Sequence, residues 1–121
     1  MMNQRPTFMH FDGSRTGWCV LYPVEIHIAG RQWEEKLIVV PLNEWDIGVR
    51  KFRFFTRCGV TAHCYVPSPK VERSISKTVA DMKEYLKKLG KLRQLQDELR
   101  STKDELHDML NDYEFSLTPF L

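Results

Sequence analysis

The chain has 121 residues, which is enough for one domain with a buried core but few for two domains of ordinary size. Hydrophobic residues make up 42%, aromatic residues 12% and charged residues 28%, a composition that excludes an intrinsically disordered or a collagen-like chain. The formal net charge of +2 is well below the strong positive charge typical of nucleic-acid-binding domains.

Location is predicted from the apolar runs and the cysteines. No apolar run reaches the roughly 20 residues that cross a bilayer, and the segment Met1–Pro6 lacks the apolar stretch of a signal peptide. The cysteines are too few for a disulfide scaffold and odd in number: Cys19, Cys58 and Cys64. We therefore expect a cytoplasmic protein with reduced thiols and no membrane partner.

Residues 1–66 are rich in β-branched and aromatic residues that alternate at a period of two. This pattern predicts an antiparallel meander of about five strands, with one dry face and one mostly wet face. Residues 43–48 are expected to form a loop. Hairpin turns are expected where glycine supplies a positive φ: Asp12-Gly13, Ala29-Gly30 and Cys58-Gly59.

The segment Pro67-Ser68-Pro69 ends the strand region, because proline cannot continue the interior of a strand. From about residue 74 to 114 there is no proline and helix formers dominate, so we expect a helix with Ser74 or Ser76 as its N-cap. The sequence therefore predicts an α+β protein. An antiparallel β domain over residues 1–69 precedes a coiled-coil-like segment over residues 70–121, formed by one long helix or by a helical hairpin.

Apolar residues in the helical segment recur every seven residues, as at the seam of a coiled coil. Met82, Leu89 and Leu110 accompany this series on one side, and Leu95 and Met109 accompany it on the other. The series that we expect to form an oligomer interface is Tyr85, Leu92, Leu99, Leu106 and Tyr113. The alternative is an amphipathic helix that lies on the sheet.

The two halves of the helical segment carry opposite charge. Residues 70–93 hold eight basic and three acidic side chains, whereas residues 94–121 hold two basic and seven acidic ones. The helix dipole favours the reverse order, so interactions within one helix do not explain this arrangement. An antiparallel partner does explain it. That partner is either the same chain, bent back at Gly90, or a second copy, and we prefer the two-fold dimer.

Four alternate residues of the predicted strand over residues 49–57 bring three cations and one aromatic ring to one face of the sheet. They are Lys51, Arg53, Phe55 and Arg57. Arginine offers phosphate a planar fork of donors, and an adjacent ring can stack on a base, so these residues are our candidate site for a nucleic acid or a nucleotide. The alternative is a solvated face whose cations protect a sheet edge from aggregation.

The sequence gives no reason to expect a metal, a cofactor or catalysis. The spacing of Cys58 and Cys64 does not match the paired ligands of zinc sites, and Cys64 is expected to be a buried thiol that acts as a small hydrophobe. The common motifs of nucleophilic, phosphate-binding and zinc-dependent catalysis are absent from the sequence. We also expect at least two of three indoles in the core: Trp18, Trp33 and Trp45.

Two functions from different classes remain open. The first is a non-enzymatic oligomeric protein that holds an anionic ligand on its β domain. The second is a small inhibitor or adaptor, of the kind that viruses and mobile elements encode, that docks its helices or its apolar tail, residues 115–121, on a host protein. The same tail could instead dock on its own chain or on a sister subunit. Charge reversal at Arg53 and Arg57 tests the first function, and replacement of Tyr113, Phe115 or Phe120 tests the second.

Overall fold

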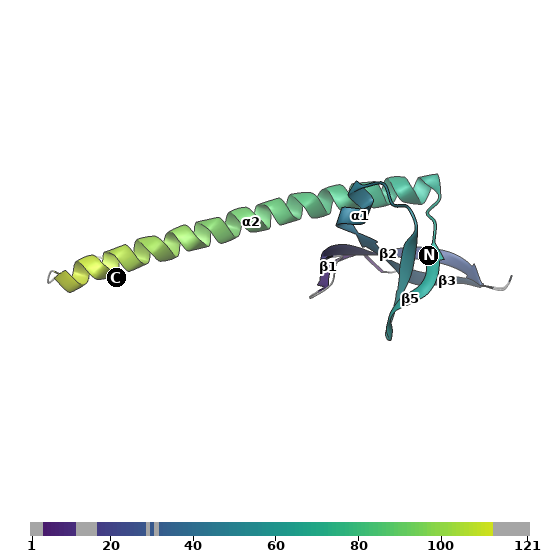
Figure 1. Ribbon diagram of the computed structural model, residues 1–121, viewed down its shortest axis with the longest axis horizontal. Coiled ribbons are helices and arrows are strands. Elements are labelled where there is room, and N and C mark those ends of the chain that lie inside the picture. Colours follow the sequence, from purple (N-terminus) through teal and green to yellow (C-terminus); the bar gives the residue numbers. More distant parts are fainter. Residues whose placement is uncertain (1–3, 12–16, 29, 31, 113–121) are drawn as a thin grey trace. The chain divides into compact units, whose positions relative to one another are not determined.

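A computed structural model describes residues 4–11, 17–28, 30 and 32–112. Contacts divide the chain into two units, Met1–Lys83 and Glu84–Leu121, and each is considered by itself. None of the helices in the described ranges is long and apolar enough to cross a membrane. The elements in chain order are β1 (Thr7–Phe11), β2 (Gly17–Ile28), β3 (Gln32–Pro41), α1 (Leu42–Asp46), β4 (Phe52–Thr56), β5 (Gly59–Tyr65) and α2 (Pro69–Asp112) (Figure 1).

The sheet is a five-stranded antiparallel meander in the order β1-β2-β3-β4-β5, which confirms the predicted α+β arrangement. The longest pairing joins β2 to β3, from Cys19 opposite Pro41 to Ile28 opposite Gln32. At the turn between β4 and β5, Gly59 has a φ of +115°, a conformation that side chains with a Cβ rarely adopt. The predicted turn at Asp12-Gly13 lies outside the described residues.

A short helix replaces the loop expected over residues 43–48. Within α1 and its C-terminal turn, the Ile47 amide donates to the Asn43 carbonyl at 3.3 Å and the Gly48 amide donates to the Trp45 carbonyl at 3.1 Å. The helix buries Trp45, whose indole stacks on the Phe52 ring at 5.9 Å between centroids. A single turn is too short to show a helical period in the sequence, and burial of Trp45 explains why the turn forms here.

One face of the sheet meets the start of α2, as Figure 1 shows. Ile75, Val79 and Met82 are buried at the i, i+4, i+7 spacing of one helix face. The Tyr22 hydroxyl of β2 hydrogen-bonds to the Ser74 hydroxyl of α2. Burial, with a smaller contribution from Tyr22, raises the pKa of Tyr65. The segment Pro69–Lys83 of α2 therefore packs as part of the first unit.

The opposite face of the sheet is not the wet face that the alternation predicts. Cys19, Leu21 and Val39 are buried there in a cluster, so the expectation of a single dry face is wrong. Partly buried side chains from β1, β3 and β4 pack against the cluster and cover it: Phe11, Leu37 and Phe55. The side chains that pack over the cluster come from several strands, so the alternation within any one strand does not predict this second buried face.

The N-cap of α2 is Ser68, not Ser74 or Ser76. The Val71 amide donates to the Ser68 side-chain oxygen at 3.3 Å, and the Glu72 amide donates to the Ser68 carbonyl at 2.8 Å. Pro69 takes the first helical position, where its missing N–H costs nothing and its fixed φ suits a helix. The prediction was wrong because proline was read only as the end of the strand.

We expect Ser68→Ala to destabilise the first unit by about 1 kcal/mol, because the Val71 amide loses its cap. Urea unfolding followed by circular dichroism measures the loss. The matched control is Ser76→Ala, which replaces an exposed serine inside the helix and should change stability by only a few tenths of a kcal/mol. An equal loss in both variants would contradict the assignment of the cap.

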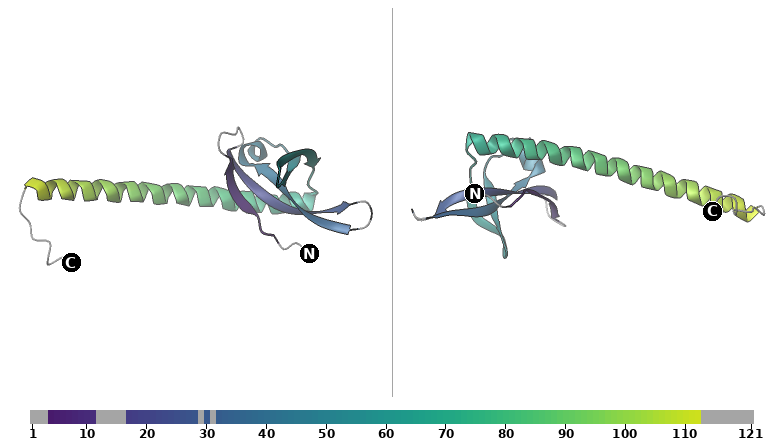
Figure 2. Two further views of the ribbon diagram at one scale, coloured as in Figure 1. Left: turned by 90° about the horizontal axis from the view of Figure 1, so that it is seen from below. Right: turned by 180° about the vertical axis from the view of Figure 1, so that it is seen from behind.

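The second unit contributes residues 84–112 of α2, which continue the helix without a break at Gly90 (Figure 2). Of the two predicted forms, the single long helix is the one present, and the helical hairpin is not formed. An ion pair joins Lys88 to Glu84 one turn earlier, at 3.1 Å. Tyr113 and the apolar tail, residues 115–121, lie outside the described residues.

Candidate anion-binding groove

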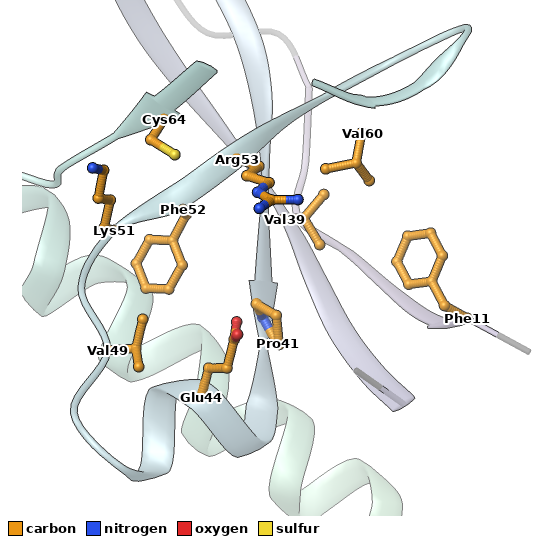
Figure 3. Close-up of a pocket in the computed structure, with 10 residues that line it drawn as sticks. All are labelled: Phe11, Val39, Pro41, Glu44, Val49, Lys51, Phe52, Arg53, Val60 and Cys64. Carbon is orange, nitrogen blue, oxygen red and sulfur yellow. The ribbon is translucent and has the colours of Figure 1, made fainter. Parts of the chain in front are cut away.

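A groove of about 700 Å³ opens beside the buried cluster, between β4, β5, the end of β3, β1 and α1. Most of its wall is apolar, and its polar side chains are two cations, one carboxylate and one thiol. The residues that line it are Phe11, Val39, Pro41, Glu44, Val49, Lys51, Phe52, Arg53, Val60 and Cys64 (Figure 3).

The backbone fixes where each cation enters the groove. Arg53 lies opposite Val39 on one neighbouring strand and Cys64 on the other, so all three share one face of the sheet. Lys51 comes directly before β4, at the end of the segment that leads from α1. Neither the Lys51 ammonium nor the Arg53 guanidinium forms a hydrogen bond or an ion pair with any residue of the described ranges, although both line the groove.

The adjacent Arg50 is used differently. Its Nε donates to Glu72 Oε1 at 2.9 Å, and its Nη1 donates to the carbonyls of Trp45 and Val49 at 3.0 and 2.8 Å. The guanidinium also lies 3.6 Å from the centre of the Trp45 ring, a cation–π contact. Arg50 therefore joins α1 to the start of α2 within the first unit, and three of its five N–H donors are occupied.

The groove also contains a hydrogen-bond acceptor. Figure 3 shows the Glu44 carboxylate of α1 and the Arg53 guanidinium of β4 both pointing into it. No ion pair joins these two groups. A ligand in the groove would therefore meet cations from β4 and its approach, a carboxylate from α1, and apolar side chains between them.

The structure brings only part of the predicted site together. Lys51 and Arg53 line the groove, but Phe55 packs against the buried cluster with its ring 6.4 Å from that of Phe11. Arg57 is exposed in the turn after β4, and it is not among the lining residues. Arg53 and Phe55 keep the predicted alternation, because β4 pairs regularly with β3, and the register shift opposite them lies in β5.

Sequence reasoning missed the groove residues that come from other elements. Phe11, Pro41, Glu44 and Val60 belong to β1, β3, α1 and β5, and the fold alone brings them to β4. No spacing in the sequence connects them. The one available signal was Glu44, an acidic residue beside an indole, which a prediction of α1 would have placed near the groove.

The cysteines do not lie as predicted. Cys64 is exposed and lines the groove, so the prediction of a buried thiol at this position is wrong. It sits on β5, an edge strand with a neighbour on one side only, and this leaves its face uncovered. Cys58 is exposed and Cys19 is buried, and none of the three cysteines forms a disulfide. Within the described ranges, no three histidine, cysteine or acidic side chains gather in a group that could hold a metal ion.

The indoles also differ from expectation. Trp45 is buried, whereas Trp18 is half-buried and packs edge-to-face with His10 at 5.1 Å. Trp33 is 69% exposed beside His27 near the end of the β2–β3 hairpin. The prediction that at least two indoles lie in the core is therefore wrong, because a hairpin end has no layer to cover Trp33.

Comparison of the chain with protein-family models, with curated proteins and with solved structures found no match in any of the three. The geometry of the groove and of the helix is therefore the basis for inferring a function.

Proposed function

We propose that this chain is a non-enzymatic, oligomeric binding protein that holds a phosphate-bearing nucleotide, free or within a nucleic acid, in the groove of its β sheet. Lys51 and Arg53 bind the phosphate, and the apolar wall of the groove contacts the base. Assembly through α2 places several such grooves in one particle.

The observation that carries the proposal is a pair of cations that have no partner among the described residues and lie on the wall of an apolar groove. A cation held against apolar surface binds an anionic ligand more strongly than a neutral one, because a charge-assisted hydrogen bond is about twice as strong as a neutral hydrogen bond. The volume of about 700 Å³ lies within the range of small-molecule sites, about 300–1,000 Å³. Phe11 supplies an aromatic face for a base.

The low net charge sets the expected strength of binding. Two cations contact one or two phosphates, so a single groove binds weakly and depends little on the length of a nucleic acid. Linked grooves bind a longer strand more tightly without any new contact, because the second binding event becomes intramolecular. The proposal therefore pairs a weak site with an oligomer.

We expect the double variant Lys51→Glu and Arg53→Glu to weaken binding of a fluorescein-labelled oligothymidylate by more than about tenfold, because it loses two charge-assisted hydrogen bonds of about 1.5–3 kcal/mol each. Fluorescence anisotropy measures the affinity. The matched control is Arg73→Glu with Lys77→Glu, which changes the net charge equally at exposed positions of α2. If both pairs of substitutions weakened binding equally, the effect would come from the overall charge, and this would contradict the proposal.

Arg57→Glu separates the groove from the linear stripe predicted from the sequence. The groove account expects a change in affinity of less than about twofold, since Arg57 does not line the groove and an exposed charge is screened by salt. If Arg57→Glu weakened binding as much as Arg53→Glu, the linear stripe rather than the groove would be the binding site. The same anisotropy titration reads out both variants.

The second candidate function is an inhibitor or adaptor that docks on a host protein through α2. The exposed apolar row of residues 84–112 favours it, because such a row can seat in the groove of another protein. A monomer that does not bind nucleotides and loses a cellular partner when Leu99 and Leu106 become aspartate would support this function.

A further inference from the structure

The helix of the second unit exposes a long apolar row. The row repeats at heptad spacing, with a second, flanking line, and each member exposes between 51% and 56% of its surface: Leu92, Leu95, Leu99, Leu106 and Met109. Soluble proteins seldom leave so regular a row of large apolar side chains in water, so the row indicates a partner.

Charge indicates which partner. Residues 84–93 hold four basic side chains and one acidic one, whereas residues 104–112 hold four acidic side chains and no lysine or arginine. A second copy that runs in the opposite direction places each basic end beside an acidic end. The self-complementary pattern therefore favours a second copy of this chain over an unrelated partner.

We infer that residues 84–112 pair with the same residues of a second copy as an antiparallel two-stranded coiled coil. In the register that brings the row together and opposes the charged ends, Leu92 lies opposite the partner's Met109, Leu95 opposite the partner's Leu106, and Leu99 opposite the partner's Thr102. This inference rests on the oligomeric part of the proposed function and adds the partner's orientation and register.

The core positions disfavour a parallel pair. If Leu92, Leu99 and Leu106 form one seam line, the other line holds Lys88, Leu95, Thr102 and Met109. A parallel dimer opposes each seam residue to its own copy, so two Lys88 ammonium groups meet in the core. It also places the acidic residues 104–112 of the two copies side by side. Both contacts are repulsive.

The antiparallel register removes both repulsions. Lys88 then lies towards the acidic end of the partner, and residues 104–112 lie beside the partner's basic end. Lys91 comes beside the partner's Asp112 on one flank of the seam, and Leu89 comes beside the partner's Leu110 on the other flank.

Cysteine cross-linking tests the orientation. In a background with Cys58→Ser and Cys64→Ser, where the remaining Cys19 is buried, Leu92→Cys and Met109→Cys are made as separate chains. We expect a disulfide-linked dimer when the two are mixed and oxidised, and none from either chain alone. In a parallel pair the two positions lie about 26 Å apart along the axis, at 1.5 Å per residue, so each chain would cross-link with itself.

A second pair of cysteine variants controls for a local effect of the substitutions. Leu95→Cys with Leu106→Cys should behave identically, and circular dichroism checks that each variant is folded. Self-linking of single variants, or a dimer in which neither mixture cross-links, would overturn the inference.

Light scattering on the unmodified chain separates the two proposals. A monomer would remove the oligomeric part of the proposed function together with this inference, while the groove titrations remain a separate test.

Discussion

Phe52→Ala is expected to destabilise the first unit by about 3–5 kcal/mol. Phe52 is 1% exposed and is one of the largest fully buried side chains of the described residues. Its ring stacks on Trp45, so truncation leaves a cavity beneath α1 and beside the groove. Urea unfolding followed by tryptophan fluorescence measures the loss, since Trp45 reports directly on this contact.

Small domains are stable by only about 5–15 kcal/mol, so Phe52→Leu provides a gentler test with an expected loss of about 1 kcal/mol. The matched control is Phe54→Ala on the same strand, whose side chain is half-buried and whose loss should be clearly smaller. A loss below about 1 kcal/mol for Phe52→Ala, or one no greater than that of Phe54→Ala, would show that the stacked pair is not central to the core.

Leu99→Asp with Leu106→Asp is expected to turn the dimer into a monomer. Each buried leucine contributes about 1.5–3 kcal/mol, and an unpaired carboxylate in the seam adds a desolvation cost. Two copies lose four leucines, so dissociation should become easier by more than about a thousandfold. Multi-angle light scattering should then give the 14.3 kDa of one chain instead of twice that mass.

The control for this variant places the same charges on another face of the helix. Gln94 and Ser101 are exposed and lie two residues beyond Leu92 and Leu99, away from the seam. Gln94→Asp with Ser101→Asp should leave the dimer mass unchanged. Dissociation in both variants would assign the effect to net charge, and no dissociation in the seam variant would exclude the apolar row as the interface.

The meander and the long helix follow directly from the sequence, because period-two alternation and a seven-residue repeat are local signals. The single helix passes through Gly90 because a glycine lowers helix stability by only about 1 kcal/mol relative to alanine, too little to break a long helix. The start of α2 was predicted six residues or more too late, since Ser68-Pro69 is equally typical of a strand end and of a helix start.

The groove could be predicted only in part, because it is assembled by contacts between elements. Lys51 and Arg53 were found from their own strand, but their distinction from Arg50 depends on Glu72 and the carbonyl of Trp45. Phe55 was assigned to the site by alternation alone, whereas its burial depends on side chains from β1 and β2. Side-chain partners, rather than residue type, separate the structural cation from the two that line the groove.

The most direct test of the groove is a titration of the ¹⁵N-labelled chain with adenosine monophosphate, followed by NMR, with adenosine as the matched control. We predict amide shifts at Lys51, Arg53, Val60 and Cys64 with the monophosphate and much smaller shifts with adenosine, because only the monophosphate meets the two cations. No shifts at these residues, or equal shifts with both compounds, would contradict a phosphate-binding groove.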